Sequence, residues 1–287
     1  SWKFYGDLRL YIYSGLFAEI SPDPVFQPMR FFIRFSSSFG TFTLGRTYIA
    51  VGNIGPFNPF DTSKELNISD VSYDKTGMDG VIWDLSLGDL TGLRMWLAPD
   101  TIVEKGAAGI SLHTNIGTFD IGAVLSRFSA EQNLAGLYFK GDLYFSVQAA
   151  LAQHFDDSVT RDFLEANLGL ERFFGTVFLQ LVYYYNEKGA DEISEYGEVF
   201  SDAYNKAKHY LYANLSFSYD EFLSFYIYSF TNGIDLSSVI APGIRWTINN
   251  GLNATMNLFF LTGGNKDEYS SAAMGRYGIM LRFEAKL

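Results

Sequence analysis

The sequence predicts an all-β fold: a single antiparallel transmembrane β-barrel of about 16 strands, with short periplasmic turns and longer extracellular loops. Three observations support this prediction. Strand-like windows recur along the whole chain, the connections between them alternate between short and long, and side chains within the windows alternate between apolar and polar. Residues 1–287 are therefore expected to form one domain.

The last window has the clearest side-chain pattern. In Tyr277–Leu287 every second residue, beginning with Tyr277, is apolar, whereas the positions between them include Arg282, Glu284 and Lys286. Because a strand has a side-chain period of two, this segment has one apolar and one charged face. An apolar face toward lipid and a charged face toward water are expected of a strand in a barrel wall.

About sixteen such windows are present, each close to the roughly 9–11 residues that a tilted strand needs to cross a hydrocarbon layer. An even number is expected of a bacterial single-chain barrel. The windows lie near residues 2–13, 28–37, 41–51, 80–87, 91–98, 106–115, 118–127, 133–142, 144–154, 162–171, 175–186, 208–218, 222–231, 236–248, 252–262 and 275–287.

The connections alternate in length. Tight turns are expected at 38–40, 88–90, 116–117, 142–143, 172–174, 219–221 and 249–251. Mostly longer connections come between them, at 14–27, 52–79, 99–105, 128–132, 155–161, 187–207, 232–235 and 263–274. This rhythm places both termini and all tight turns on one side, as in outer-membrane barrels.

The two files of side chains differ in charge. The apolar files, such as Phe31, Ile33 and Phe35, contain no charged residue, and an Arg or Lys near the bilayer centre would cost about 2–4 kcal/mol. We expect these files to face lipid and the opposite files to face water. The opposite files hold Arg9, Arg30, Arg34, Asp84, Arg94, His113, Asp120, Lys140, Glu165, Asn167, Arg245, Asn257 and Arg282.

Composition excludes several classes of protein. The chain has no Cys, and therefore no disulfide framework and no thiolate metal site. A net charge of −11 without any run of Lys or Arg argues against nucleic-acid binding. No stretch of about 18 apolar residues is present, so no transmembrane helix is predicted. Ser1-Trp2-Lys3-Phe4 does not resemble a signal peptide, and a mature exported form is expected.

Aromatic residues make up 17% of the chain and gather toward window ends, as at Tyr183-Tyr184-Tyr185 and Trp246. One interpretation is a pair of aromatic girdles at the membrane interfaces. The other is that aromatic residues are simply good strand formers.

Two segments resemble known proteins. The terminal strand resembles that of bacterial outer-membrane β-barrels, although the family usually ends in an aromatic residue and this chain ends in Leu287. The segment 44–52, followed by Phe57-Asn58-Pro59-Phe60-Asp61, resembles a strand-plus-loop motif of porin-like outer-membrane proteins. Resemblance to general porins implies a homotrimer in outer-membrane lipid, and a long loop that folds into the barrel and narrows the pore.

The connection 52–79 is the candidate for that pore-constricting loop, since a structureless loop of this length usually has a function. By the resemblance, its carboxylates would face the channel, namely Asp61, Glu65, Asp70, Asp74 and Asp79. The alternative is a surface loop packed over the rim. Just before it, the alternation breaks at Gly45, where a bulge would turn Arg46 into the lumen.

Charged residues on the polar files predict selectivity. Arg residues from neighbouring strands would form a basic pore wall that faces Asp84, Asp120, Glu165 and the acidic loop. Separated charges of this kind create a transverse field that sorts solutes. The alternative is ordinary ion pairing between strands. The candidates for the basic wall are Arg9, Arg30, Arg34, Arg46, Arg94, Arg245 and Arg282.

The predicted function is a passive channel for small hydrophilic solutes and ions in the bacterial outer membrane, without enzymatic activity, cofactor or nucleic-acid partner. The alternatives are a structural or adhesive barrel with a plugged pore, a soluble all-β binding protein, and a barrel enzyme. For an enzyme the best pair would be Ser158 and His154, and oxygen ligands for Ca²⁺ could come from Asp156-Asp157 or the acidic residues of 191–202.

Overall fold

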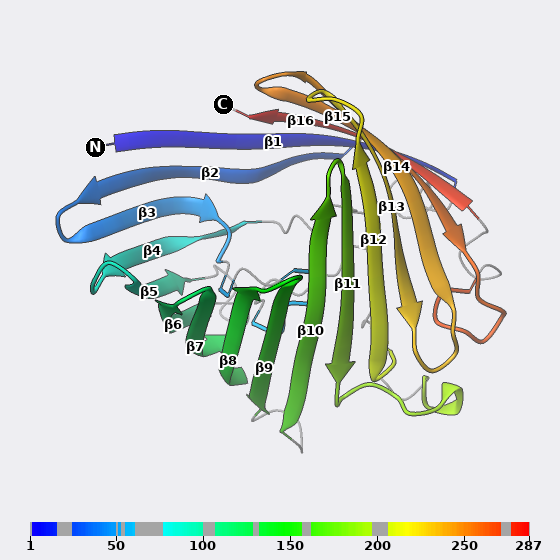
Figure 1. Ribbon diagram of the computed structural model, residues 1–287, viewed down its shortest axis with the longest axis horizontal. Helices are drawn as coiled ribbons and strands as arrows, with labels where there is room; N and C mark the ends of the chain where they lie inside the picture. The colour runs from blue at the N-terminus through cyan, green and yellow to red at the C-terminus, as the bar shows by residue number, and fades with distance from the viewer. Residues whose placement is uncertain are drawn as a thin grey trace. The chain divides into compact units, whose positions relative to one another are not determined.

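The computed structural model describes residues 2–15, 25–49, 51–52, 55–60, 77–99, 107–128, 132–156, 162–196, 206–270 and 277–286. Within these residues the one helical element is the 3-10 helix η1 (Ile193–Glu195), and none of their helices is long and apolar enough to cross a membrane. The strands are β1 (Trp2–Gly15), β2 (Val25–Ser37), β3 (Gly40–Thr47), β4 (Met78–Ser86), β5 (Thr91–Ala98), β6 (Ala107–Ile116), β7 (Phe119–Phe128), β8 (Gln132–Asp142), β9 (Ser146–Asp156), β10 (Phe163–Phe174), β11 (Val177–Asn186), β12 (His209–Ser218), β13 (Leu223–Asn232), β14 (Ser238–Asn249), β15 (Leu252–Leu261) and β16 (Tyr277–Lys286) (Figure 1).

Each strand neighbours the strands before and after it in the chain, and the first strand neighbours the last. In the antiparallel β1–β16 pair, Leu10 lies opposite Phe283 and Ser14 opposite Ile279. The all-β prediction and the predicted strand number are confirmed, and each expected window overlaps one strand.

The connections alternate in length as predicted. Those from an even-numbered strand to the next strand are short, and we call these strand ends the turn side and the opposite ends the loop side. The β7–β8 connection, 129–131, is an exception on the loop side because it is as short as a turn. The turn-side connections are 38–39, 87–90, 117–118, 143–145, 175–176, 219–222 and 250–251.

Local chemistry fixes where the short turns lie. Gly117 and Gly175 have φ of 66° and 64°, a left-handed conformation that glycine adopts at low cost. In the β12–β13 turn, Asp220 Oδ1 accepts hydrogen bonds from the backbone N–H groups of Phe222 and Leu223 at 2.8 and 2.7 Å. The turn expected at 172–174 is displaced, since β10 continues through Phe174 and the chain reverses at Gly175.

The bulge predicted at Gly45 is wrong. The β2–β3 and β3–β4 pairs continue in register through this position, with Phe32 and Gly80 opposite Gly45. A Cβ there would lie 2.5 Å from the carbonyl oxygen of Phe31, so glycine is required by the close approach of β2. A register shift lies instead in β14, between Thr247 and Asn249.

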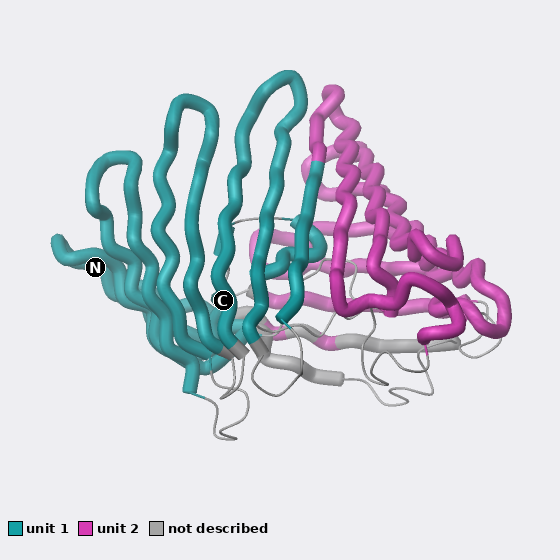
Figure 2. The backbone as a smooth tube through the Cα atoms, turned by 90° about the horizontal axis from the view of Figure 1, so that it is seen from below, with its two compact units in different colours: residues 1–6, 29–64, 75–169 teal, residues 7–28, 65–74, 170–287 magenta. Residues whose placement is uncertain are grey.

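Two compact units make up the chain (Figure 2). The first contains residues 1–6, 29–64 and 75–169, and therefore most of β2 and all of β3 to β9. The second contains residues 7–28, 65–74 and 170–287, with all of β11 to β16.

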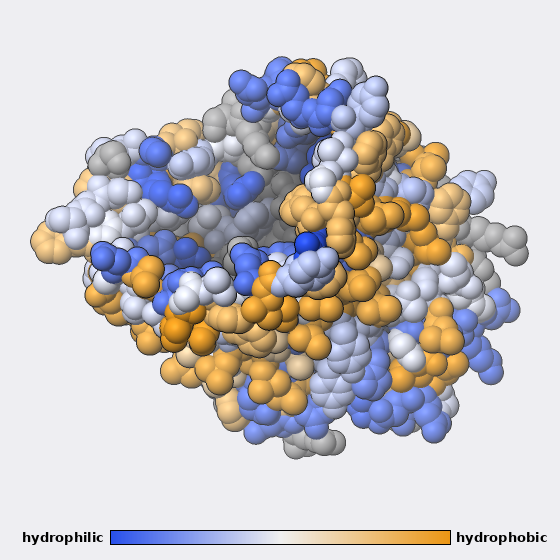
Figure 3. Space-filling model, viewed as in Figure 1, coloured by the Kyte–Doolittle hydropathy of each residue, from blue (hydrophilic) through white to orange (hydrophobic). Residues whose placement is uncertain are grey.

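Side chains within the strands alternate between an exposed apolar file and a buried file. In β12, Leu211 and Leu215 are 48% and 46% exposed, whereas Tyr210 and Tyr212 are buried. We call the exposed file the outer face and the other the inner face. Along β12 to β14 in Figure 3, hydrophobic residues gather over the middle of the strands and hydrophilic residues toward their ends. An exposed apolar face of this kind matches a lipid environment rather than water.

Candidate functional site

The inner face of the first unit carries opposite charges on adjacent strands. Arg94 Nε of β5 lies 2.6 Å from Asp84 Oδ1 of β4, and both side chains are about one-third exposed. On β7 and β8, Asp120 lies opposite Lys140 in the register, and its Oδ1 accepts a hydrogen bond from Asn115 at 2.9 Å. Arg94 and Asp84 were predicted on opposing walls, but they form an ion pair between neighbouring strands.

Two arginines of β2 lie on aromatic rings of the same unit. The guanidinium of Arg34 is 5.5 Å from the ring centre of Tyr5 and 5.3 Å from that of Phe32, and these two rings stack at 4.8 Å. The guanidinium of Arg30 lies 4.8 Å from the ring of Tyr48. Cation–π contact places each positive charge against an aromatic ring, and both arginines remain partly exposed, so the charge still acts on its surroundings.

Arg46 does not belong to the inner face. With the register continuous through Gly45, Arg46 shares the outer file of Phe42 and Leu44. It lies at the loop-side end of β3, where its Nη2 is 2.6 Å from Asp79 Oδ2 of β4. The prediction that Arg46 lines the lumen depended on the bulge and is corrected with it. Asp79, expected to face the channel from the long loop, belongs instead to β4 and lies opposite Arg46 on the outer file.

In the second unit, Arg245 and Arg282 lie in one row. Both face Thr255 of β15 in the register, Arg245 from β14 and Arg282 from β16. Arg282 is 2% exposed, whereas Arg245 is exposed and lies 5.9 Å from the ring of Tyr226. Of the row, Arg245 alone is therefore accessible to a solute.

Four carboxylates and one arginine of the predicted set lie outside what the structure describes. Asp61, Glu65, Asp70 and Asp74 fall in the undescribed part of the long connection, and the side chain of Arg9 is not described, although its backbone pairs with Glu284. Ser158, the candidate nucleophile, also falls outside the described residues.

Glu165 of β10 is buried on the inner face beside His154 of β9. His154 Nε2 lies 3.4 Å from Glu165 Oε2, and Phe163 stacks on the imidazole at 4.3 Å. The two side chains are only 2% and 4% exposed. Glu165 is therefore a buried partner of a histidine rather than an open acidic lining residue.

A short segment, residues 55–60, lies against the inner face of β8 to β10, and we call it the inner segment. The Gly55 N–H donates to Gln148 Oε1 at 3.1 Å, and Asn167 Nδ2 donates to the carbonyl oxygens of Pro56 and Phe57 at 2.7 and 3.0 Å. Gln148 and Asn167 are on the inner files of β9 and β10 and are 1% and 3% exposed.

The inner segment joins an apolar cluster on the loop-side half of the first unit. Phe60 is 1% exposed, and its ring lies 5.8 Å from that of Tyr138. Inner-face residues of β4 to β9 fill this region, together with residues that follow β3. The cluster contains Ile49, Val51, Phe60, Ile82, Trp96, Ala98, Ala107, Val124, Leu134, Tyr138, Ala150 and Ala152.

Burial on the inner face follows the same gradient in both units. In β5, Trp96 and Ala98 toward the loop side are 4% and 1% exposed, whereas Arg94 toward the turn side is partly exposed. In β13, Tyr228 is buried, and Ser224 toward the turn side is partly exposed. On these two strands the more accessible inner-face side chains therefore lie on the turn-side half.

A buried polar network joins the loop-side connections of the second unit. Glu268, which follows β15, accepts hydrogen bonds from Tyr210 Oη at 2.6 Å, Asn232 Nδ2 at 2.8 Å and the Lys206 N–H at 3.0 Å. Asp235 accepts bonds from Tyr196 Oη at 2.9 Å and from the Glu268 N–H at 2.8 Å. We call Tyr196, Tyr210, Asn232, Asp235 and Glu268 the loop-side network.

Among the described residues no cationic side chain acts on the Glu268 carboxyl, because Tyr210 and Asn232 are neutral and Lys206 contributes its backbone N–H. Burial of the carboxyl is therefore not offset by an opposite charge. Burial raises the pKa of Glu268 to about 7, although the bonds from Tyr210, Lys206 and Asn232 oppose this shift. Burial and the bond to Asp235 likewise raise the pKa of Tyr196 above its ordinary value. Glu268 therefore titrates close to neutral pH.

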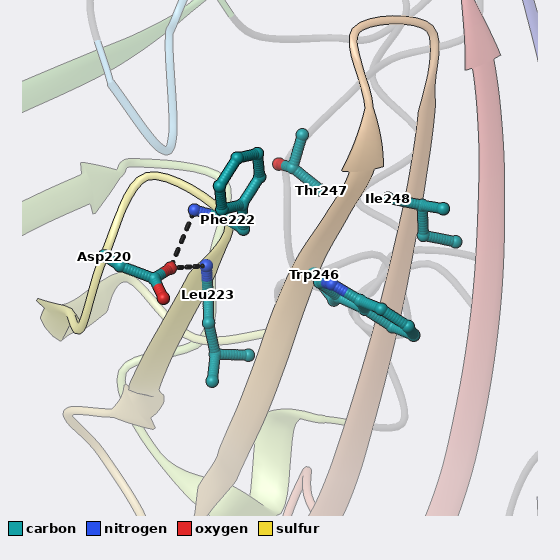
Figure 4. Close-up of a pocket in the computed structure, with 6 residues that line it drawn as sticks. All are labelled: Asp220, Phe222, Leu223, Trp246, Thr247 and Ile248. Carbon is teal, nitrogen blue, oxygen red and sulfur yellow. Dashed lines mark hydrogen bonds between the residues drawn. The ribbon is translucent and has the colours of Figure 1, made fainter.

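A surface pocket lies on the turn side of the second unit (Figure 4). It is lined by Asp220, Phe222, Leu223, Trp246, Thr247 and Ile248. Trp246 and Phe222 are 54% and 48% exposed, at the ends of strands, where the girdle interpretation expects aromatic side chains.

Within the described residues no group of three or more His, Cys, Asp or Glu could hold a metal ion, and Asp191 is paired with Lys208.

Sequence reasoning missed the loop-side network and the role of Gln148. Asn167 was expected on the polar file but without a partner, and the inner segment was recognised only as part of a motif. The Asn232–Asp235 spacing is a usable local signal, because Asn232 Oδ1 accepts bonds from the N–H groups of the next turn, at 2.7 Å from Ile234.

Comparison with known proteins identifies the fold. No family model matches the sequence, and no curated protein matches it. OccK10 (OpdN) of Pseudomonas aeruginosa is similar with a TM-score of 0.63 at 9% identity, over 100% of this chain and 98% of that chain. OpdQ of the same organism gives 0.64 at 9% identity, over 100% and 98%. A porin refined at 1.8 Å resolution gives 0.56 at 10% identity, over 100% of both chains.

These neighbours are bacterial outer-membrane porins, and identities this low establish the fold alone. The chain has the fold of a porin barrel, and the resemblance that the terminal strand and the segment 44–61 predicted is confirmed at that level.

Proposed function

We propose that this chain is a channel of the bacterial outer membrane through which small hydrophilic solutes and ions diffuse passively. The observation that carries the proposal is the two-faced sheet, in which an exposed apolar file alternates with an inner file that bears accessible charges on its turn-side half. An apolar outer face requires lipid, and charged inner side chains require water. The porin fold supports the same conclusion by analogy.

Charge selection in the proposed channel would depend on the accessible arginines. Arg30 and Arg34 lie on aromatic rings, and Arg245 is exposed above Tyr226, so these three are proposed as the main basic lining. Arg94 is partly neutralised by Asp84. Arg9 and the carboxylates Asp61, Glu65, Asp70 and Asp120 complete the proposed lining, which leaves out the buried Arg282. We also propose a homotrimer, as in general porins.

A second candidate is a structural barrel with a closed interior. The apolar cluster and the burial of the loop-side half of the inner face favour it, because a wet lumen does not require tightly packed apolar side chains. In that case the exposed loop-side residues, among them Asp191 and Glu192, would serve as a contact surface.

Conductance of the detergent-extracted protein in planar bilayers distinguishes the two. A channel is expected to give stepwise openings, in groups of three for a trimer, and the reversal potential in a KCl gradient gives the sign of the preferred ion. Arg34→Gln and Arg245→Gln should shift that potential toward cations, because each removes a positive charge from the lining. Silent bilayers with insertion verified would contradict the channel and favour the closed barrel.

A further inference from the structure

The inner segment is attached to the sheet by side chains rather than by strand pairing. Backbone groups buried away from water need hydrogen-bond partners. Three groups of the segment, the Gly55 N–H and the carbonyls of Pro56 and Phe57, find theirs in Gln148 and Asn167. Two side chains of adjacent strands therefore satisfy three backbone groups of a segment far away in the sequence.

The segment has an internal brace that keeps it compact. Asn58 Nδ2 donates to the carbonyl oxygen of Val51 at 2.9 Å, and its Oδ1 accepts a bond from the Phe60 N–H at 3.0 Å. Pro56 and Pro59 on either side restrict the backbone further. The segment thus meets the sheet as one stiff unit.

Phe57 holds a conformation that needs support from its surroundings. Its φ is 61°, in the left-handed region that an aromatic residue rarely adopts. Such a conformation persists only where neighbouring contacts determine it. The bonds from Asn167 to the carbonyls of Pro56 and Phe57 act directly at this point of the chain.

Phe60 anchors the other end of the segment in a niche above Gly136. A Cβ on Gly136 would lie 2.4 Å from Phe60 Cε1, so the ring occupies the space that any larger residue would take. The anchoring points span much of the inner face, because Gly136 pairs with Ala152 toward the loop side and Gln148 lies near the turn-side end of β9. A solute that moves along this wall would meet the segment over that length.

We propose that Gln148 and Asn167 are positioning residues that latch the inner segment onto β8 to β10, and that the latched segment restricts passage through the channel. The second half of this inference rests on the proposed channel function. Gln148 and Asn167 carry no charge, so the latch holds at any pH at which the barrel is folded. Solutes would be restricted on this wall by the segment itself, independently of the charged lining.

The test uses the absence of cysteine in the chain. A reporter, Phe57→Cys, places one thiol at a position that is 4% exposed and leaves intact the backbone carbonyl that Asn167 binds. Its rate of reaction with a water-soluble methanethiosulfonate is measured alone, with Gln148→Leu and Asn167→Leu together, and with each of these singly. Gln153→Leu is the matched control, since Gln153 lies on the same strand as Gln148 but on the outer file.

Loss of one hydrogen bond shifts a local equilibrium about five-fold, so the double variant is expected to be labelled about ten-fold faster or more. Its single-channel conductance, measured without the reporter, should exceed that of the unaltered protein, and Gln153→Leu should change neither quantity. A difference in electrophoretic migration between heated and unheated samples verifies that each variant folds.

The outcomes separate the two claims. An unchanged labelling rate in the double variant would overturn the latch. Faster labelling with unchanged conductance would leave the latch standing but overturn the restriction of passage. If the unaltered protein and every variant insert but never conduct, the channel function itself fails, and the labelling rates still decide whether the latch exists.

Discussion

Two regions of this protein hold chain segments in place by different chemistry. In the first unit, the neutral amides of Gln148 and Asn167 bind backbone groups of the inner segment. In the second unit, the carboxylate of Glu268 gathers Tyr210, Asn232 and the backbone at Lys206. Both sites are buried and each binds a backbone group of a loop-side connection, but only the second contains a group that titrates near neutral pH.

This difference between neutral amides and a buried carboxyl determines how the stability of each region depends on pH. A neutral amide contributes the same contacts at all pH values of interest, whereas a buried carboxyl without a cation favours its protonated form. The pKa of Glu268 is about 7 in the folded protein against 4.5 for a free carboxyl. Stability from this group is therefore complete below about pH 4.5 and is lost as pH rises through about 7.

The largest effect is expected where the inner segment is anchored by packing. Phe60→Ala removes a ring that is 1% exposed and leaves a cavity above Gly136, which should lower the free energy of unfolding by about 3–5 kcal/mol. Urea unfolding of the detergent-refolded protein measures this. Phe39→Ala, at a turn-side position that is 77% exposed, is the control and should change stability very little.

Glu268→Gln tests the titratable site. The unaltered protein should lose about 3 kcal/mol of stability between pH 4.5 and pH 8, from the shift of the Glu268 pKa. Gln keeps the acceptor oxygen and cannot ionise, so the variant should lose much less over the same range. Urea midpoints as a function of pH give both curves. Identical curves would show that Glu268 does not control the pH dependence, and Glu221→Gln, in an exposed turn, should leave the curve unaltered.

Asn167→Asp should make the attachment of the inner segment in the first unit depend on pH, as the Glu268 site of the second unit does. An ionised Asp would face the carbonyl oxygens of Pro56 and Phe57 with no proton to donate, whereas the protonated acid can still donate one. We expect a loss of about 1–3 kcal/mol at pH 8 that is largely recovered in acid. Because the reactive thiolate form of Phe57→Cys increases with pH in every background, the quantity to compare is the ratio of its labelling rates with and without Asn167→Asp, and this ratio should rise with pH.

The sequence predicted the strands well because their signal is local. Alternation within each window and the alternating lengths of the connections are properties of short stretches, and each expected window overlaps one strand. The bulge at Gly45 was wrong because the reason for that glycine lies on β2, at the carbonyl oxygen of Phe31. The partners of the inner segment were missed for the same reason, since Gln148 and Asn167 lie 93 and 111 residues away from the groups they bind.

For the candidate site, the sequence predicted which face of the sheet a side chain lies on but not which partners it has, and the reason is related. Parity within a strand placed Arg34, Arg94, Arg245 and Glu165 on the inner face, but it could not tell which of them would be paired, stacked or buried. Glu165 beside His154 and Arg94 beside Asp84 depend on cross-strand register. Register follows from the whole sheet and not from any one window.

The smallest effect on stability is expected at the ion pair Arg46–Asp79, because this pair is exposed whereas the carboxyl of Glu268 is buried. Its side chains are 35% and 64% exposed, and exposed ion pairs contribute about 0–1 kcal/mol. A double-mutant cycle of Arg46→Gln and Asp79→Asn should therefore give a coupling energy within that range, and it should decrease in high salt. Because Arg46 lies on the outer file, Arg46→Gln should also leave the reversal potential unchanged, in contrast to Arg34→Gln. A shift equal to that of Arg34→Gln would place Arg46 in the lumen after all and would contradict the continuous register through Gly45.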